Sequence, residues 1–171
     1  MKEAVVRLER YVDCVRDIER LENIEMKREP QDTQMLVNEL KQDISQLEQD
    51  KKLIFTSDIS SSTINIDKIV FFRILDNLIR NAIRYAESKI EIGITQNEDF
   101  LILSVKDDGM GFSDTDLMQA TTLFYSKDKG KEHFGIGLSI CKLLCEKHGG
   151  TLYLSNGKEK GACIIAEIKI L

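Results

Sequence analysis

The feature that most constrains the fold is a helical pattern followed directly by two alternating segments. From Asp67 to Tyr85, apolar residues recur at helical spacing, and Asp67 is a typical N-cap residue. Residues 90–95 and 100–105 then alternate apolar and polar side chains, and the polar turn 97–99 between them predicts a β-hairpin. A helix beside an antiparallel hairpin favours an α+β fold.

The rest of the chain adds elements of both kinds. Amphipathic patterns and a cap residue predict further helices at 33–49, after Ser113 and at 137–147. Short apolar or alternating runs predict strands at 53–57, around Ile64, at 151–154 and at 162–170. We therefore expect a two-layer sandwich in which helices pack on a mixed, mostly antiparallel sheet.

The N-terminal residues 2–28 contain neither glycine nor proline and predict one long helix. Apolar residues recur there at steps of four and three, as in a helix that packs against another helix: Ala4, Leu8, Tyr11, Val15 and Ile18. Val5, Val12 and Leu21 widen this stripe, so we expect a bundle formed by dimerisation or docking. The alternative is a core helix of the same globular domain. Pro30, the only proline, places a domain boundary between residues 1–30 and 31–171.

Composition limits the classes of function. The chain of 171 residues fits one globular domain with an appendage, and 42% hydrophobic with 31% charged residues is ordinary soluble composition. A net charge of -5 provides no general attraction to nucleic acid. No apolar run approaches the roughly 20 residues of a membrane span, and no secretory leader is evident. We expect a soluble cytoplasmic domain, which does not exclude membrane segments in a longer parent protein.

The four cysteines fall within periodic apolar patterns, unlike a disulfide framework: Cys14, Cys141, Cys145 and Cys163. A reduced cytosolic protein is the simpler interpretation. Cys141, Cys145 and His148 share one helical face and have the donor atoms of a metal site. No fourth ligand is evident, and cysteine is a common buried apolar residue, so the core interpretation is favoured.

Three short phrases carry the candidate chemistry. The first, L-D-N-L-I-R-N-A-I-R-Y-A, places Asn77 and Asn81 on one helix face, with Arg84 and Tyr85 one turn further along. An amide oxygen suits a hard cation such as Mg²⁺, and arginine suits a phosphate. The alternative is that the asparagines are surface positions, although asparagine is a poor helix former.

The second phrase, D-D-G-M-G-F, begins with Asp107 at the end of a strand, and Gly109 and Gly111 follow. Glycine allows positive φ and close approach of the backbone to a ligand. An ionised carboxylate there is able to accept a hydrogen bond from the exocyclic amine of adenine. Taken alone, the phrase is more typical of an ordinary strand-ending turn.

The third phrase, F-G-I-G-L-S, follows a polar, lysine-rich stretch from Tyr125 to Phe134 and opens a helix. Backbone N–H groups at a helix N-terminus bind anions, and the lysines add positive charge, so this segment suits a lid over phosphates. The alternative is a flexible solvated loop. No G-K-[ST] follows the glycines, so this is not a Walker P-loop. In this order, the phrases predict a pocket for a metal-bound nucleoside triphosphate.

Together the phrases resemble the N, G1, F and G2 boxes of the ATP-binding domain of sensor histidine kinases, in the Bergerat-type ATPase superfamily. Residues 2–28 resemble the second helix of the family's dimerisation hairpin, and 31–171 its catalytic domain. Phe124 and Tyr125 match the F box, and His148-Gly149-Gly150 matches the phrase after the last helix. The resemblance implies a Bergerat-type fold that binds ATP and Mg²⁺.

The resemblance also implies roles for single residues. Asn81 would coordinate Mg²⁺, and Asn77 and Lys127 would be catalytic residues at the phosphates. Asp107 would bind the adenine amine. Arg84 would approach the phosphates, Tyr85 would lie near the base, and the other nucleotide-binding positions would be Gly109, Gly111, Phe112, Ser126, Gly135, Gly137 and Leu138.

Two features depart from the family pattern. His133 stands in the lid where family members usually have a glycine, and the larger side chain restricts the hinge at this position. No segment matches the phosphoacceptor histidine, since the chain's other histidine is His148, and we expect a fragment that starts after the acceptor. Hydrolytic relatives have a glutamate base where this chain has Asn77, and Asp76 points about 100° away round the helix. Transfer to histidine is therefore favoured over hydrolysis.

The leading hypothesis is the ATP-binding catalytic domain of a two-component sensor histidine kinase. It would transfer the γ-phosphoryl group of ATP to a histidine on a dimerisation helix, for relay to a response regulator receiver domain. Expected partners are that receiver domain and the dimerisation hairpin, and the parent is expected to be a homodimer in a bacterial cell membrane. One alternative is a degenerate kinase domain that acts as a nucleotide-binding or dimerisation module. Another is a serine kinase of the anti-sigma type.

Overall fold

The computed structural model describes residues 2–47, 50–122 and 136–170, with side chains from residue 12 onward. Its helices are α1 (Lys2–Glu22), α2 (Thr33–Ser45), α3 (Lys68–Tyr85), α4 (Asp114–Gln119) and α5 (Gly137–Lys147). Its strands are β1 (Glu29–Asp32), β2 (Lys52–Asp58), β3 (Thr63–Ile66), β4 (Lys89–Gln96), β5 (Phe100–Asp107), β6 (Leu152–Asn156) and β7 (Ala162–Lys169). No described helix is long and apolar enough to span a membrane.

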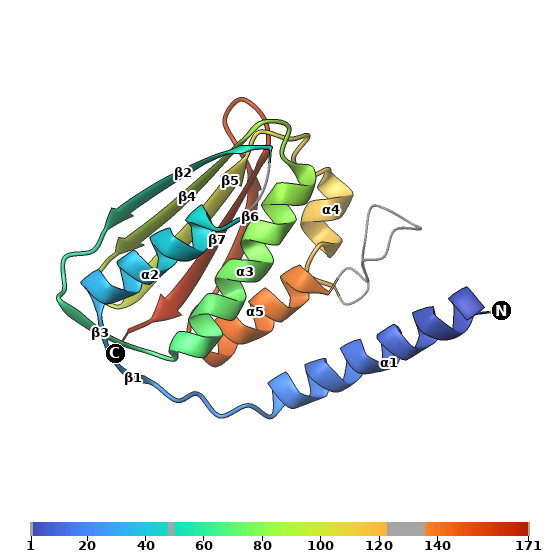
Figure 1. Ribbon diagram of the computed structural model, residues 1–171, viewed down its shortest axis with the longest axis horizontal. Coiled ribbons are helices and arrows are strands. Elements are labelled where there is room, and N and C mark those ends of the chain that lie inside the picture. The colour runs from blue at the N-terminus through green and yellow to red at the C-terminus, as the bar shows by residue number, and fades with distance from the viewer. Residues whose placement is uncertain (1, 48–49, 123–135, 171) are drawn as a thin grey trace.

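The structure has two layers, as Figure 1 shows: helices α2, α3 and α5 lie across one face of a five-stranded sheet. The strand order is β2-β4-β5-β7-β6, with β2 and β4 parallel and the other neighbours antiparallel. The β4–β5 hairpin forms as its alternation predicts, and Asp67 caps α3 by accepting the N–H of Val70 at 3.1 Å. The predicted two-layer α+β sandwich is confirmed.

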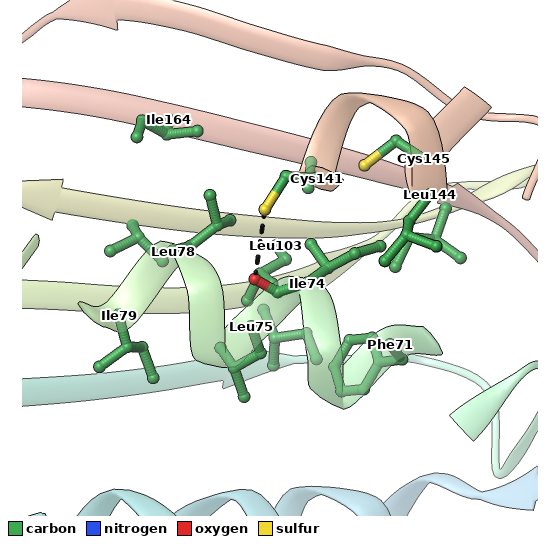
Figure 2. Close-up of a cluster of buried hydrophobic side chains, with 14 of the residues drawn as sticks. Phe71, Ile74, Leu75, Leu78, Ile79, Leu103, Cys141, Leu144, Cys145 and Ile164 are labelled. Atoms are coloured by element: carbon green, nitrogen blue, oxygen red, sulfur yellow. Dashed lines mark hydrogen bonds between the residues drawn. The ribbon is translucent and has the colours of Figure 1, made fainter. Parts of the chain in front are cut away.

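The core fills the space between the sheet and the helices, because each contributes one apolar face. Helix α3 buries a continuous stripe that includes Phe71, Ile74 and Leu78, each 0% exposed. These side chains meet Leu103 of β5 and Leu144 of α5 in the cluster shown in Figure 2. Helix α3 is therefore fixed against the sheet along its length, so the side chains on its other face have defined positions.

The N-terminal region departs from prediction in two respects. Helix α1 ends at Glu22 rather than near residue 28, and an unpredicted strand, β1, follows it and pairs antiparallel with β3. Pro30 lies within β1, which has a partner on one side only, a position where a missing N–H is tolerated. Strand β1 contains residue 30, so the strand itself does not mark a domain boundary there. The division into units 1–30 and 31–171 stays a prediction. The last turns of α1 pack beside α5, and Ile18 and Leu21 are buried.

The predicted group of Cys141, Cys145 and His148 belongs to the interior. The thiol of Cys141 donates to the carbonyl of Ile74 at 3.7 Å, and Cys145 lies in the same apolar cluster (Figure 2). Burial raises the pKa of both thiols. Within the described ranges, no group of three or more His, Cys, Asp or Glu side chains is placed to hold a metal ion.

His148, at the end of α5, connects this helix with the start of α3 and with the linker after α1. Its Nε2 accepts the backbone N–H of Asp67 at 2.9 Å, and its carbonyl accepts from Nη2 of Arg28 at 2.8 Å. Asp67 in turn accepts the N–H of Lys27 at 2.9 Å. Burial and the neighbouring Arg28 charge lower the pKa of His148, in keeping with an imidazole that must stay neutral to accept. The linker after α1 is thus tied to both α3 and α5.

Candidate active site

A cavity of about 840 Å³ runs along the open face of α3 and reaches the first turn of α5. Eight residues predicted from the sequence line it: Asn77, Asn81, Arg84, Tyr85, Gly111, Phe112, Gly137 and Leu138. The cavity also continues toward α2, where Asp43, Ile44 and Leu47 form its wall. No sequence pattern indicated this extension, because it forms where α2 and α3, which are distant in sequence, lie side by side (Figure 1).

The two asparagines of α3 are half-buried in the cavity wall. Nδ2 of Asn77 donates to the carbonyl of Arg73 at 3.1 Å, which fixes the amide on its own helix. A Cβ added to Gly137 would lie 3.6 Å from Oδ1 of Asn77, so that oxygen faces the start of α5. Among the described residues, no hydrogen bond uses the side-chain amide of Asn81. One face of α3 therefore presents an amide that is available to a ligand.

The end of the same helix carries a cation and an aromatic ring. The guanidinium carbon of Arg84 lies 5.7 Å from the ring centroid of Tyr85. This contact orients an exposed positive charge beside a half-buried ring at the cavity edge. A phosphate and a flat base are the kinds of ligand group that such a pair suits.

Asp107 lies at the end of β5, where its side chain is buried, and it is not among the residues that line the cavity. Its Oδ1 accepts the N–H of Gly109 at 2.9 Å and the N–H of Ala162 at 3.2 Å, and Ala162 lines the cavity. No hydrogen bond within the described part of the chain uses Oδ2. The carboxylate is thus held by the backbone through one oxygen only.

The two glycines after Asp107 are needed for different reasons. A Cβ at Gly109 would lie 2.0 Å from the carbonyl oxygen of Tyr85, so this glycine allows the turn to approach the end of α3. Gly111 has φ +73°, a conformation that favours glycine. Of the pair, only Gly111 lines the cavity.

Two polar side chains to which the sequence assigned no role, Asp108 and Asn156, hold the turn from Asp107 to Phe112. Asp108 accepts the N–H groups of Glu87, Ser88 and Lys89 and the hydroxyl of Ser88, which ties the turn to the α3–β4 connection. Asn156, at the end of β6, bonds both backbone groups of Phe112. In both contacts the two bonded segments are distant in sequence: residues 87–89 from Asp108, and Asn156 from Phe112. The pair Asn156-Gly157 indicates a turn, but it does not indicate which residues that turn contacts.

Residues 66–171 match the family described as histidine kinase-, DNA gyrase B-, and HSP90-like ATPase. The chain belongs to this family. It is 32% identical over 171 residues to sensor protein SrrB of Staphylococcus aureus (strain NCTC 8325 / PS 47), an alignment that covers 95% of the chain and 29% of SrrB. The chain thus spans less than a third of the length of the curated relatives it matches.

Solved structures share the fold of this domain. Histidine kinase AdeS of Acinetobacter baumannii is similar with TM-score 0.71 and 26% identity, over 97% of this chain and 80% of AdeS. Full-length ShkA, solved in complex with AMPPNP, shares the fold with TM-score 0.70 and 23% identity, over 85% of this chain and 31% of ShkA. The chain is therefore the ATP-binding catalytic domain of a two-component sensor histidine kinase, as the order of its motifs implied.

The residue before Asn77 is a carboxylate, Asp76, and it is paired with Arg80. Both oxygens of Asp76 accept from Nε of Arg80, at 2.9 and 2.8 Å, and the two exposed side chains lie at the cavity lining. The helix turns by about 100° between neighbouring residues, which carries Asp76 away from the direction of Asn77.

The G2 box is described only from Ile136 onward. Gly137 is the first residue of α5, and its cap residue, Ile136, makes no side-chain capping bond, so no described side chain caps the first N–H groups of this helix. The lid and F-box predictions lie outside the described residues: Phe124, Tyr125, Ser126, Lys127, His133 and Gly135. Their roles stay predictions.

Asp108→Asn is expected to weaken the dependence of the kinase domain's stability on acid pH. The hydroxyl of Ser88 and then the backbone N–H groups lower the pKa of Asp108 from its ordinary value of 3.8. A lowered pKa means that the carboxylate stabilises the fold above about pH 3.8 and loses this contribution as the pH falls through the folded-state value. Urea unfolding from about pH 6 to pH 3 should therefore show a shallower decline for the variant. Asp58→Asn, at the exposed end of β2, should decline like wild type, and equal slopes for Asp108→Asn and wild type would contradict the assignment.

Proposed function

We propose that this domain binds ATP with Mg²⁺ and donates the γ-phosphoryl group to a histidine on a dimerisation helix. The observation that carries the proposal is the face of α3 in the cavity, where neutral amides stand at Asn77 and Asn81 beside the Arg84 cation. This set offers ligands for a metal and a phosphate. Asp43, Asp76 and Asp116 also line the cavity, but the position at which hydrolytic relatives have a glutamate base for water is Asn77 here.

The cavity fits such a ligand in size and chemistry. Its volume of about 840 Å³ lies in the range of small-molecule and cofactor sites. Asn81 is the proposed metal ligand, because an amide oxygen suits Mg²⁺ and no described residue bonds its side chain. Mg²⁺ would supply charge neutralisation at the phosphates. ShkA, which shares this fold, was solved with AMPPNP, and that supports a nucleotide here.

The other residues of the site would bind and orient. Asn77 is fixed by its bond to Arg73, so it would hold a phosphate in one position rather than move with it. Arg84 would add positive charge from the cavity edge, and Tyr85 would lie along the base. Asp107 would use Oδ2 for the adenine amine, because the backbone already occupies Oδ1. Lys127 is proposed as a further cation at the phosphates.

The choice between transfer and hydrolysis rests on Asn77. An amide does not accept a proton at neutral pH, and Asp76 is paired with Arg80. An imidazole acceptor needs no such base, because its neutral form is already a nucleophile near neutral pH. The domain then needs only to position the two reactants and neutralise charge.

The test has a binding step and a transfer step. ATP and ADP are titrated with and without Mg²⁺, and absence of binding at millimolar nucleotide would exclude the kinase proposal. The domain is then mixed with a separately made dimerisation hairpin that carries an acceptor histidine, and with labelled ATP. Acid-labile label on the hairpin is expected, and none on a matched hairpin whose histidine is replaced by alanine.

Other outcomes of the same experiment identify the alternatives. Binding without transfer would indicate a degenerate nucleotide-binding module, and acid-stable label would indicate a serine kinase. Steady phosphate release by the domain alone would contradict the argument from Asn77. We also propose, from the family, that the parent protein is a membrane-bound homodimer and passes the phosphoryl group to a response regulator.

A further inference from the structure

The end of β6 holds the turn beside the cavity through a single side chain. Oδ1 of Asn156 accepts the N–H of Phe112 at 2.7 Å, and its Nδ2 donates to the carbonyl of Phe112 at 2.8 Å. Both backbone groups of one residue are therefore satisfied by one amide. Phe112 is part of the cavity wall, whereas Asn156 does not line the cavity.

The fit around Asn156 is close. A Cβ added to Gly111 would lie 2.6 Å from Oδ1 of Asn156, so the amide packs against the α-carbon of Gly111. The same hairpin also holds the beginning of the turn, because the N–H of Ala162 bonds Oδ1 of Asp107. Residues of β6 and β7 thus bond both ends of the turn: Ala162 bonds Asp107, and Asn156 bonds Phe112, which is the end that lines the cavity.

The chemistry of this contact is particular to an amide. One side chain must present a donor and an acceptor to the N–H and C=O of the same residue, and asparagine has both at the end of a short stem. A carboxylate has the same shape but only acceptors, so it would face the carbonyl of Phe112 without a hydrogen to donate.

We propose that Asn156 is a positioning residue that sets nucleotide affinity by holding Gly111 and Phe112 in the binding conformation. This rests on the proposed ATP binding and adds a residue outside the N, G1, F and G2 boxes. When the amide is removed, the turn samples other conformations, and the apparent Kd rises by the inverse of the fraction that stays competent. Asn156 does not line the cavity, so it would act on the ligand only through Gly111 and Phe112.

The test compares Asn156→Ala, Asn156→Asp and the control Ser155→Ala. Ser155 is the neighbour on β6, and its hydroxyl donates to the carbonyl of Cys163 at 3.3 Å and to no atom of the turn from Asp107 to Phe112. Titration with ATP and Mg²⁺ at low temperature, with folding checked by circular dichroism, is expected to show about a tenfold weaker Kd for both Asn156 variants. The control is expected to stay within about twofold of wild type. Amide exchange at Phe112, followed by NMR, should accelerate in the Asn156 variants alone.

The outcomes separate this proposal from the function on which it rests. Wild type that binds no ATP would overturn both. Wild type that binds, together with folded Asn156 variants of unchanged affinity, would overturn the positioning role alone. Weaker ATP binding without faster amide exchange at Phe112 would also overturn it, because the affinity would then fall for a reason other than a change in the turn. A Phe112 amide that is unprotected in wild type would overturn it even if the variants fail to fold.

Discussion

Asn81→Ala is expected to weaken Mg²⁺-dependent ATP binding by about a hundredfold, which corresponds to about 2.7 kcal/mol. The side chain is half-buried in the cavity wall and makes no hydrogen bond to any described residue, so its removal leaves the fold of α3 in place. What is lost is a neutral oxygen ligand that the cation needs. Binding in the presence of a metal chelator should be nearly the same for variant and wild type.

The measurement is calorimetric titration with ATP, once with Mg²⁺ and once with the chelator. Asn38→Ala is the matched control, since Asn38 is an exposed asparagine on α2 whose Oδ1 accepts from Gln34 at 3.1 Å. It should bind like wild type in both conditions. Full affinity of Asn81→Ala with Mg²⁺ would contradict the metal assignment. Equal losses with and without Mg²⁺ would show a general defect of the pocket.

Gly109→Ala is expected to lower the free energy of unfolding by about 3 kcal/mol or more. The added Cβ would lie 2.0 Å from the carbonyl oxygen of Tyr85 and 2.8 Å from its carbonyl carbon. Both are backbone atoms, so no rotamer change relieves the clash, and either the turn or the end of α3 must move. Nucleotide binding should weaken as well, because Tyr85 lines the cavity.

Gly137→Ala is the control for this prediction, and it is expected to raise the free energy of unfolding rather than lower it. Among the described residues, the nearest atom to its added Cβ is Oδ1 of Asn77 at 3.6 Å, an ordinary contact. Alanine in the first turn of α5 also lowers the conformational entropy of the unfolded chain, which favours stability by up to about 1 kcal/mol. Urea unfolding at neutral pH distinguishes the two variants. Wild-type stability of Gly109→Ala would show that α3 and the turn are not in close contact.

The regular elements were predictable because their signals are local. The helix from Asp67 to Tyr85 and the hairpin after it are specified by side-chain periodicity and by a cap residue, which act over a few neighbouring positions. The same periodicity places Asn77 and Asn81 on one face, so their joint presence in one cavity wall followed from spacing alone.

Strand β1 was missed because its signal is not local. Glu29–Asp32 has no alternating pattern and contains Pro30, so nothing within it indicates a strand. Its conformation depends on pairing with β3, more than thirty residues along the chain, from Glu29↔Ile66 to Asp32↔Thr63. His148, Asp67 and the Lys27–Arg28 linker are likewise brought together by packing across distant segments.

The sequence by itself determined the family of the domain, its layers and the chemical groups along α3. These depend on residue types at short, fixed spacings, where helix and strand geometry leaves little freedom. Only the tertiary structure decided how the Asp107–Phe112 turn is held, because its partners come from the α3–β4 connection and from the end of β6. The sequence assigned no role to Asp108 or Asn156, because their contacts exist only once the sheet places the end of β5 near the α3–β4 connection and near the end of β6.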